Sequence, residues 1–353
     1  MNKDFHYYGT YCAARTAGYA QEEAKTIAFY AQFVDECTKT ESGKLKEQAQ
    51  AAGRALEPVY TVQSVSGMMH KYGLDPRPFT PEQLVQVEGI WCPFHFLPGN
   101  VQSTVAATNG EEPGRFALLC LPNSSTVLVM LNALFQDPCL EHIGMVMHIL
   151  ADTWAHEFFA GVPSYGINEA VGDVTDDTGN RFTFLYPADD NLDRNIFSCT
   201  PRAPRVNSLS YLGHGRMGHL PDLGYLHYHY TPVWSSQPVE KDNPRDFRSA
   251  YCQMVYVLTC IREHREFDFD VFRAAEAGGY ANEIDDALSI LTRKGNEAYV
   301  CAAMAERLSD ELPDYSHQAY FAQGDKWDSL ERFFAAAGAH KEMVLAAFPE
   351  IAQ

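Results

Sequence analysis

The chain has 353 residues, 46% of them apolar, which is enough for one large hydrophobic core or two smaller ones. Its formal charge of −19 offers no basic field to phosphates, so we expect no non-specific binding of nucleic acid. The sequence has no apolar run long enough to span a membrane, no secretory signal pattern at its start and no Cys-x-x-Cys pair among its nine cysteines, which together favour a cytoplasmic protein.

Spaced apolar residues and helix-favouring composition predict that most of the chain is helical. The expected helices cover residues 10–38, 40–56, 138–160, 244–264, 268–277, 281–310 and 326–347.

Two other stretches have a different character. In residues 90–135, the apolar runs 116–121 and 126–131 flank a Pro-Asn-Ser-Ser turn and favour two strands, with helix as the alternative for the second run. Residues 162–240 are rich in Gly, Pro, Asn and Asp, so we expect an irregular, pocket-forming segment. Residues 1–353 are therefore predicted to form a single mainly helical domain with a small β element and a long irregular layer.

The predicted helix 138–160 carries the first chemical signal. His148, Asp152 and His156 are spaced four residues apart, and each step rotates only about 40° beyond a full turn, so all three project from one face. Imidazole nitrogens and carboxylate oxygens suit Zn²⁺ and similar divalent ions such as Mn²⁺. The spacing predicts a metal site, with a buried hydrogen-bonding network as the alternative.

Further ligand-type side chains occur where the local sequence favours a role in such a site. Asp35 ends an apolar helical stretch, where a charge needs a partner. His95 lies between aromatic residues, and His214 and His219 flank glycines, which let the backbone approach an ion closely. The candidate metal ligands are His6, Asp35, His95, His148, Asp152, His156, His214, His219 and Asp222.

Two histidines are assigned differently. His227 and His229 alternate with tyrosines in the run Tyr-Leu-His-Tyr-His-Tyr, which predicts a strand. We expect these two histidines to line the pocket rather than to bind the ion.

The order of the candidate ligands resembles that of the zinc-dependent phospholipase C and S1/P1 nuclease superfamily. That likeness implies an all-helical phosphodiesterase whose ligands are an N-terminal group, a nearby His, an Asp closing a helix, a His, a helical His-x-x-x-Asp, another His, and a late His with an Asp or Glu. The matching residues in this sequence are His6, Asp35, His95, His148, Asp152, His156, His219 and Asp222.

The chain as a whole resembles more closely an uncharacterised bacterial family that opens with Asp-Phe-His-Tyr-Tyr and carries Ala-Asp-Thr-x-x-His, a likeness that implies no particular reaction.

The sequence departs from the superfamily pattern in three places. The gap from Asp152 to His156 is short, and His219 precedes Asp222 by three residues where the superfamily has four. The superfamily's N-terminal ligand arises by signal cleavage, whereas this chain begins at Met1. We therefore expect one or two zinc or manganese ions rather than three.

The predicted chemistry is metal-assisted hydrolysis, with a small phosphodiester or a lipid as substrate. A bound ion would polarise a phosphoryl oxygen and lower the pKa of its water to about 7. Asp35 or Asp152 could bridge ions or orient that water, and Arg216 could clamp a phosphate, with a plain surface role as its alternative. Two other functions stay open, a non-catalytic metal- or ligand-binding protein and an effector-like interaction protein with a structural histidine network.

Overall fold

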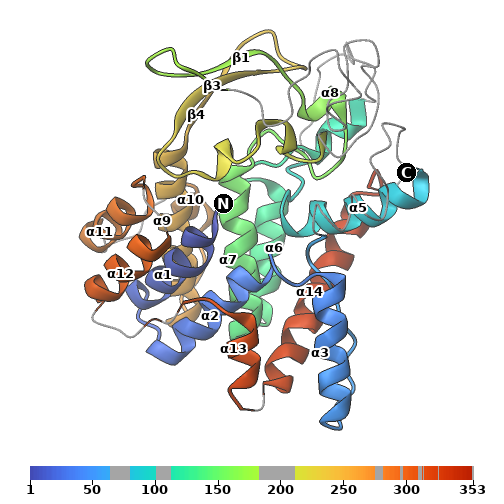
Figure 1. The fold of residues 1–353 in the computed structure, drawn as a ribbon, viewed down its shortest axis with the longest axis vertical. Helices are drawn as coiled ribbons and strands as arrows, with labels where there is room; N and C mark the ends of the chain where they lie inside the picture. The colour runs from blue at the N-terminus through green and yellow to red at the C-terminus, as the bar shows by residue number, and fades with distance from the viewer. Residues whose placement is uncertain are drawn as a thin grey trace.

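The computed structural model describes residues 1–63, 80–100, 113–182, 211–274, 281–294, 297–308, 312, 314–324 and 326–351. Within these residues the chain is mostly helical with one small antiparallel sheet, as predicted. Figure 1 shows the sheet over one end of the helices, with the N-terminus near the junction of the two layers. None of the helices in the described ranges combines the length and the apolar character needed to cross a membrane.

Each predicted helical segment contains helix, and further helices lie outside those segments. Those of the N-terminal half are the π-helical turn η1 (Asp4–Gly9), α1 (Thr10–Thr16), α2 (Gln21–Phe33), α3 (Lys39–Ala51), α5 (Pro81–Phe94), α6 (Ser125–Gln136), α7 (Leu140–Ala155) and α8 (Tyr165–Asn168), with the 3₁₀ turn η2 (Pro113–Leu118). Those of the C-terminal half are α9 (Asn243–Arg262), α10 (Phe269–Arg273), α11 (Ala281–Leu291), α12 (Glu297–Leu308), α13 (His317–Ala322) and α14 (Trp327–Ala347). The predicted segment 281–310 holds two helices, α11 and α12, and α5, α6, α8 and α13 lie outside the predicted segments.

Helix α7 runs through the centre of the helical layer. It packs against α2, α6, α9 and α14, and nearly all of its side chains are buried, charged ones included (Figure 1). A helix that is apolar on most of its surface can be buried on every side, and α7 is buried in this way. Polar groups on α7 must therefore find their partners inside the protein.

The sheet has the strand order β2-β1-β3-β4. Its strands are β1 (Ala170–Asp176), β2 (Arg181–Phe182), β3 (His227–Pro232) and β4 (Val239–Asp242), all paired antiparallel. Side chains of β3 alternate, so that Tyr228 and Tyr230 are buried and pack on Phe159 and Phe96 in a second small core beneath the sheet. The 3₁₀ turns η4 (Gly215–Met217) and η5 (Leu220–Asp222) lead into β3.

The prediction of two strands within residues 90–135 is wrong: neither apolar run forms a strand, and the second is helix α6, the alternative that its sequence left open. Ser124 accepts a hydrogen bond from the backbone N–H of Val127 and caps this helix, so the Pro-Asn-Ser-Ser sequence begins a helix instead of joining two strands. The first run contains η2 and one isolated bridge, between Pro98 and Cys120. Residues 101–112 lie outside the described residues.

The regular β structure lies instead in the segment 162–240, which was expected to be irregular. The strand predicted for the Tyr-Leu-His-Tyr-His-Tyr run is confirmed as β3, whereas β1, β2 and β4 carry no clear alternation in the sequence. Residues 183–210 of this segment lie outside the described residues.

The predicted helix 10–38 is two helices, because Gly18 adopts φ +90° at the end of α1. The N–H of Tyr19 donates to the carbonyl of Ala14 and that of Gly18 to Arg15, which is a Schellman cap. The break turns α2 so that it lies along α7.

Gly144 sets how closely α2 approaches α7. A methyl group at this position would lie 2.9 Å from Cβ of Tyr30 and 3.1 Å from the backbone nitrogen of Ala31, and closer still to the carbonyl of Ile27. Since two of these atoms are backbone, the helices would have to separate. The close approach places the end of α2 beside the polar face of α7.

We predict that Gly144→Ala destabilises the protein although alanine is the better helix former. Overpacking a close-packed core costs about 1–3 kcal/mol, against a propensity gain of about 1 kcal/mol. The free energy of unfolding, measured with urea, should fall. The control is Gly43→Ala in α3, where no atom lies within 4 Å of the added methyl group; it should raise stability by about 0.5–1 kcal/mol. Equal effects of the two substitutions would contradict the close-packing argument.

Candidate metal centre

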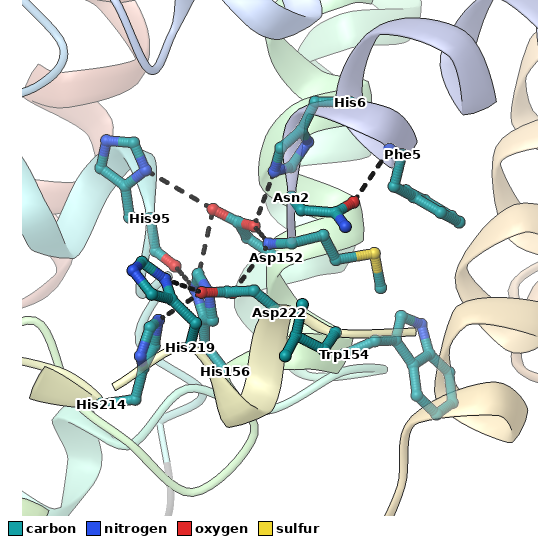
Figure 2. A network of polar contacts seen from close by, with 12 residues as sticks. Asn2, Phe5, His6, His95, Asp152, Trp154, His156, His214, His219 and Asp222 are labelled. Carbon is teal, nitrogen blue, oxygen red and sulfur yellow. Dashed lines mark hydrogen bonds and ion pairs between the residues drawn. The ribbon is translucent and has the colours of Figure 1, made fainter. Parts of the chain in front are cut away.

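The carboxylate of Asp152 on α7 is buried, and imidazoles surround it (Figure 2). Its Oδ2 lies 3.2 Å from Nε2 of His148 and 3.5 Å from Nδ1 of His95. Its Oδ1 lies 3.1 Å from Nε2 of His6, which η1 supplies. His148 is one turn before Asp152 on the same helix, whereas His95 ends α5 and His6 comes from the first residues of the chain.

Asp35, two residues after α2, adds a second carboxylate to the same group. Its Oδ1 lies 3.7 Å from Nδ1 of His95 and 3.8 Å from Nε2 of His148. The side chain is 33% exposed, so Asp35 lies at the edge of the buried group where solvent can enter.

His156, His214 and Asp222 form a further group beside the first. Nε2 of His156 lies 3.3 Å from Oδ1 of Asp222, and Nε2 of His214 lies 3.6 Å from Oδ2. His156 is the C-cap of α7, and its Nδ1 lies 3.7 Å from Oδ2 of Asp152, which joins the two groups. Gly213 allows this arrangement because its φ is +55° and a side chain there would enter the ring of Phe96.

Backbone carbonyls orient three of the rings. Nε2 of His95 lies 3.0 Å from the carbonyl of Thr61, Nδ1 of His156 lies 2.6 Å from that of His95, and Nδ1 of His214 lies 2.7 Å from that of Gly218. A carbonyl can only accept, so the ring N–H must point to it. In the neutral form of each ring, the lone pair of the other nitrogen faces the carboxylates, which is the orientation found in histidines that bind metal.

Among the described side chains, His6 is the buried histidine with the poorest hydrogen bonding. Neither of its ring nitrogens makes a hydrogen bond of good geometry, although Nε2 lies 3.1 Å from Oδ1 of Asp152, and Nδ1 of His148 makes none either. The two rings stack with their centroids 3.9 Å apart. A buried polar atom without a partner costs about 1–3 kcal/mol, so the arrangement is explained if a ligand such as an ion completes it.

The protonation states suit metal binding. Burial lowers the pKa of His6 and of His214 to about 4, so both imidazoles are neutral at pH 7. Burial opposes ionisation of Asp152 and Asp222, but the surrounding imidazoles and the Met1 amine outweigh it and hold the pKa of each carboxyl well below its usual value. Neutral imidazoles and ionised carboxylates are the forms that coordinate a cation.

The spacing of these atoms fits tetrahedral coordination. Zn²⁺ binds nitrogen and oxygen at about 2.1 Å, which places neighbouring ligand atoms of a tetrahedron about 3.4 Å apart. Three groups of residues in this centre have their ligand atoms within 4.8 Å of one another, and the pairs above lie at 3.1–3.8 Å. The groups are His6/Asp35/His148, His95/His148/Asp152 and His156/His214/Asp222.

The amine of Met1 is a participant that the sequence did not suggest. It is buried against Oδ1 of Asp152 and lies 3.5 Å from Oδ1 of Asp222. Burial opposes its protonation, but these carboxylates outweigh it and raise the pKa of the amine. The amine therefore supplies positive charge at the point where the two groups of ligands meet.

Two candidates lie apart from these groups. His219 approaches the same oxygen of Asp222 as His214, at 3.5 Å, but it is 82% exposed whereas His214 is 17% exposed, so His214 takes the inner place expected of His219. Arg216 is buried and donates from Nε to Glu169 at 2.8 Å, so its guanidinium ties η4 to the start of β1 and is not a surface arginine. The other eight predicted ligands are brought together.

A protein-family model described as a family of unknown function, DUF6765, matches residues 1–348. The chain belongs to this family. The match includes every candidate ligand and confirms membership of an uncharacterised family. No curated protein and no solved structure matches the chain. These comparisons carry no link to the phospholipase C and P1 nuclease superfamily, so that relationship rests on the residues alone.

We predict that the metal-free protein loses stability in mild acid because of its buried histidines. Below pH 6.5 the unfolded chain binds protons at His6 and His214, whereas in the folded state both pKa values are about 4. The free energy of unfolding should therefore fall by up to about 1.4 kcal/mol per pH unit for each histidine as the pH drops from 6.5 toward 4.

Urea unfolding of chelated protein at pH 7, 6 and 5 measures this slope. His214→Asn should reduce the slope of unfolding free energy against pH by up to about 1.4 kcal/mol per pH unit, the contribution of one histidine. His264→Asn removes an exposed histidine whose φ of +49° asparagine tolerates, and it should leave the slope unchanged. An unaltered slope in His214→Asn would show that His214 is protonated in the folded protein.

Proposed function

We propose that this protein is a metal-dependent hydrolase that cleaves phosphodiesters, with a helical domain of the phospholipase C and P1 nuclease type. The observation that carries the proposal is the gathering of eight ligand-type side chains from separate segments into two adjoining groups, with the buried carboxylate of Asp152 in contact with four of the histidines. The order of these ligands along the chain supports the kinship, with His214 in place of His219.

Two ions would account for six of these eight side chains without sharing a residue, and His6 and Asp35 lie beside the first of them. His95, His148 and Asp152 would hold one, and His156, His214 and Asp222 the other. Nitrogen and oxygen donors of this kind suit Zn²⁺, with Mn²⁺ as the alternative. Ions bound there would supply Lewis-acid polarisation of a phosphoryl oxygen and a nucleophilic water near neutral pH.

The side chains would divide the remaining work by their burial. Asp152, whose two oxygens face different imidazoles, would hold the two halves of the centre at a set distance. Asp35 is the partly exposed carboxylate and would orient the attacking water or accept its proton. Arg216, buried against Glu169, would act by holding the η4 loop in place, and a direct role in clamping phosphate requires that it leave this pair.

A small phosphodiester or a lipid head group is the substrate class that this edge of the site would take. The solvent-accessible edge is formed by Asp35, His214 and Asp222, whose side chains are 33%, 17% and 13% exposed. Hydrolysis needs such an opening, since one coordination position must be free for water or substrate.

A closed, non-catalytic metal site is the second candidate. It is favoured by the complete burial of His148 and Asp152, which gives substrate no access to the inner group. In that case both ions would be coordinated by protein groups throughout.

We predict that the purified protein retains about two equivalents of metal and hydrolyses bis-p-nitrophenyl phosphate with added Zn²⁺ or Mn²⁺. His148→Ala should lower the metal content, and it should lower the rate of hydrolysis about a hundredfold. The matched control is His142→Ala, which removes a histidine of the same helix whose ring contacts the carbonyl of Asp137 outside the centre. It should retain metal and activity.

Elemental analysis and the rate assay separate the candidates. Metal below about 0.3 equivalents after purification without chelator would refute the metal centre. Full metal content without hydrolysis under any metal would leave the closed binding site.

A further inference from the structure

The sheet carries another histidine–carboxylate group outside the centre described above. His227 and His229 alternate on β3 with two buried tyrosines, so both histidines lie on the outer face of the sheet, 31% and 37% exposed. They do not line the pocket as predicted. Their ring centroids are 5.5 Å apart. Asp177, in the turn between β1 and β2, contacts both rings.

The turn that presents Asp177 is held by its own hydrogen bonds. Oδ1 of Asp176 accepts the backbone N–H groups of Thr178 and Asn180, each at 2.9 Å. Gly179 completes the turn with φ +82°. The carboxylate of Asp177 is thus placed over β3 by the backbone of the turn.

The positions of the ligand atoms fit a metal site. Asp177, His227 and His229 each offer one ligand atom within 4.8 Å of the others. Oδ1 of Asp177 lies 3.2 Å from Nε2 of His229, close to the tetrahedral spacing of about 3.4 Å. Glu240, which faces His229 across the β3–β4 ladder, contacts Nε2 of His227 at 2.8 Å. An outer carboxylate of this kind orients a ligating imidazole and leaves its Nδ1 for the ion.

We propose that Asp177, His227 and His229 form a second, solvent-exposed site for Zn²⁺, separate from the buried centre. Two imidazoles and one carboxylate provide three ligands, and the exposure of all three side chains leaves the remaining position to water or to an external ligand. An ion here links the β1–β2 turn to β3, and Glu240 joins β4 to the same group. The site exchanges its ion with solvent and binds it more weakly than the buried centre.

Without an ion, the same contacts describe an imidazolium of His227 held between Asp177 and Glu240. Burial opposes protonation of this ring, but the two carboxylates outweigh it and raise its pKa. The two arrangements differ in whether Zn²⁺ replaces the proton, which a binding measurement detects.

The test is a Zn²⁺ titration of the whole protein at pH 7.5 by calorimetry, after dialysis against a weak chelator that empties exposed sites. We expect one additional equivalent with micromolar affinity. Asp177→Asn should weaken it about tenfold or more. The control is Asp173→Asn, which removes a carboxylate of the same hairpin that pairs with Arg181 and not with the histidines; it should leave the additional equivalent intact.

A second readout is the visible absorption of Co²⁺ added in place of Zn²⁺. His229→Gln should remove the part of this absorption that comes from the ion at the exposed site. Absence of the additional equivalent in the wild-type protein would overturn the proposal, and so would equal losses in Asp177→Asn and Asp173→Asn. The result does not depend on how fully the buried centre is occupied, because Asp177→Asn alters only the exposed group and the comparison is between its titration and that of Asp173→Asn.

Discussion

Asp152 belongs to α7, a helix that other elements cover on every side. Its carboxylate is buried, and the negative charge must therefore be compensated by other groups of the protein. The effective cost of burying one ion is several kcal/mol. Polar contacts with the carboxylate offset this cost. His148 contacts it from the same helix, and His6, His95 and the Met1 amine contact it from other segments. The carboxylate of Asp152 thus connects α7 to the start of the chain and to the end of α5.

The same constraint joins the helices to the sheet. His156 belongs to the end of α7 but contacts Asp222, which lies in the loop that leads to β3. A second buried ion pair anchors the sheet nearby: Lys241 of β4 lies 2.6 Å from Asp246 at the start of α9 and donates to the carbonyl of Trp154 on α7. Both contacts fix the β layer over the end of α7, so the outer ligands keep their distance from the inner ones.

Burial divides the histidines of this protein into two kinds. In the buried centre, His6 and His214 are neutral at pH 7, and backbone carbonyls orient the rings of His95, His156 and His214, an arrangement that suits a tightly held cation. Those on the outer face of β3 lie in water beside carboxylates and can take either a proton or an ion. The first kind suits chemistry that requires a rigid, partly desolvated site, and the second suits reversible binding.

Helical spacing was sufficient to place His148 and Asp152 on one face of α7 and to predict the mostly helical fold, because both depend on a period that local sequence carries. The alternation of His and Tyr likewise predicted β3, but the choice of His214 over His219, the contact of the Met1 amine and the strands β1, β2 and β4 depend on long-range packing. Glycine-rich loops have no period to read, and a chain terminus carries no pattern that indicates where it lies. The strand-like run that became α6 shows the same limit, since its short apolar stretch suits either structure until Ser124 is seen to cap it.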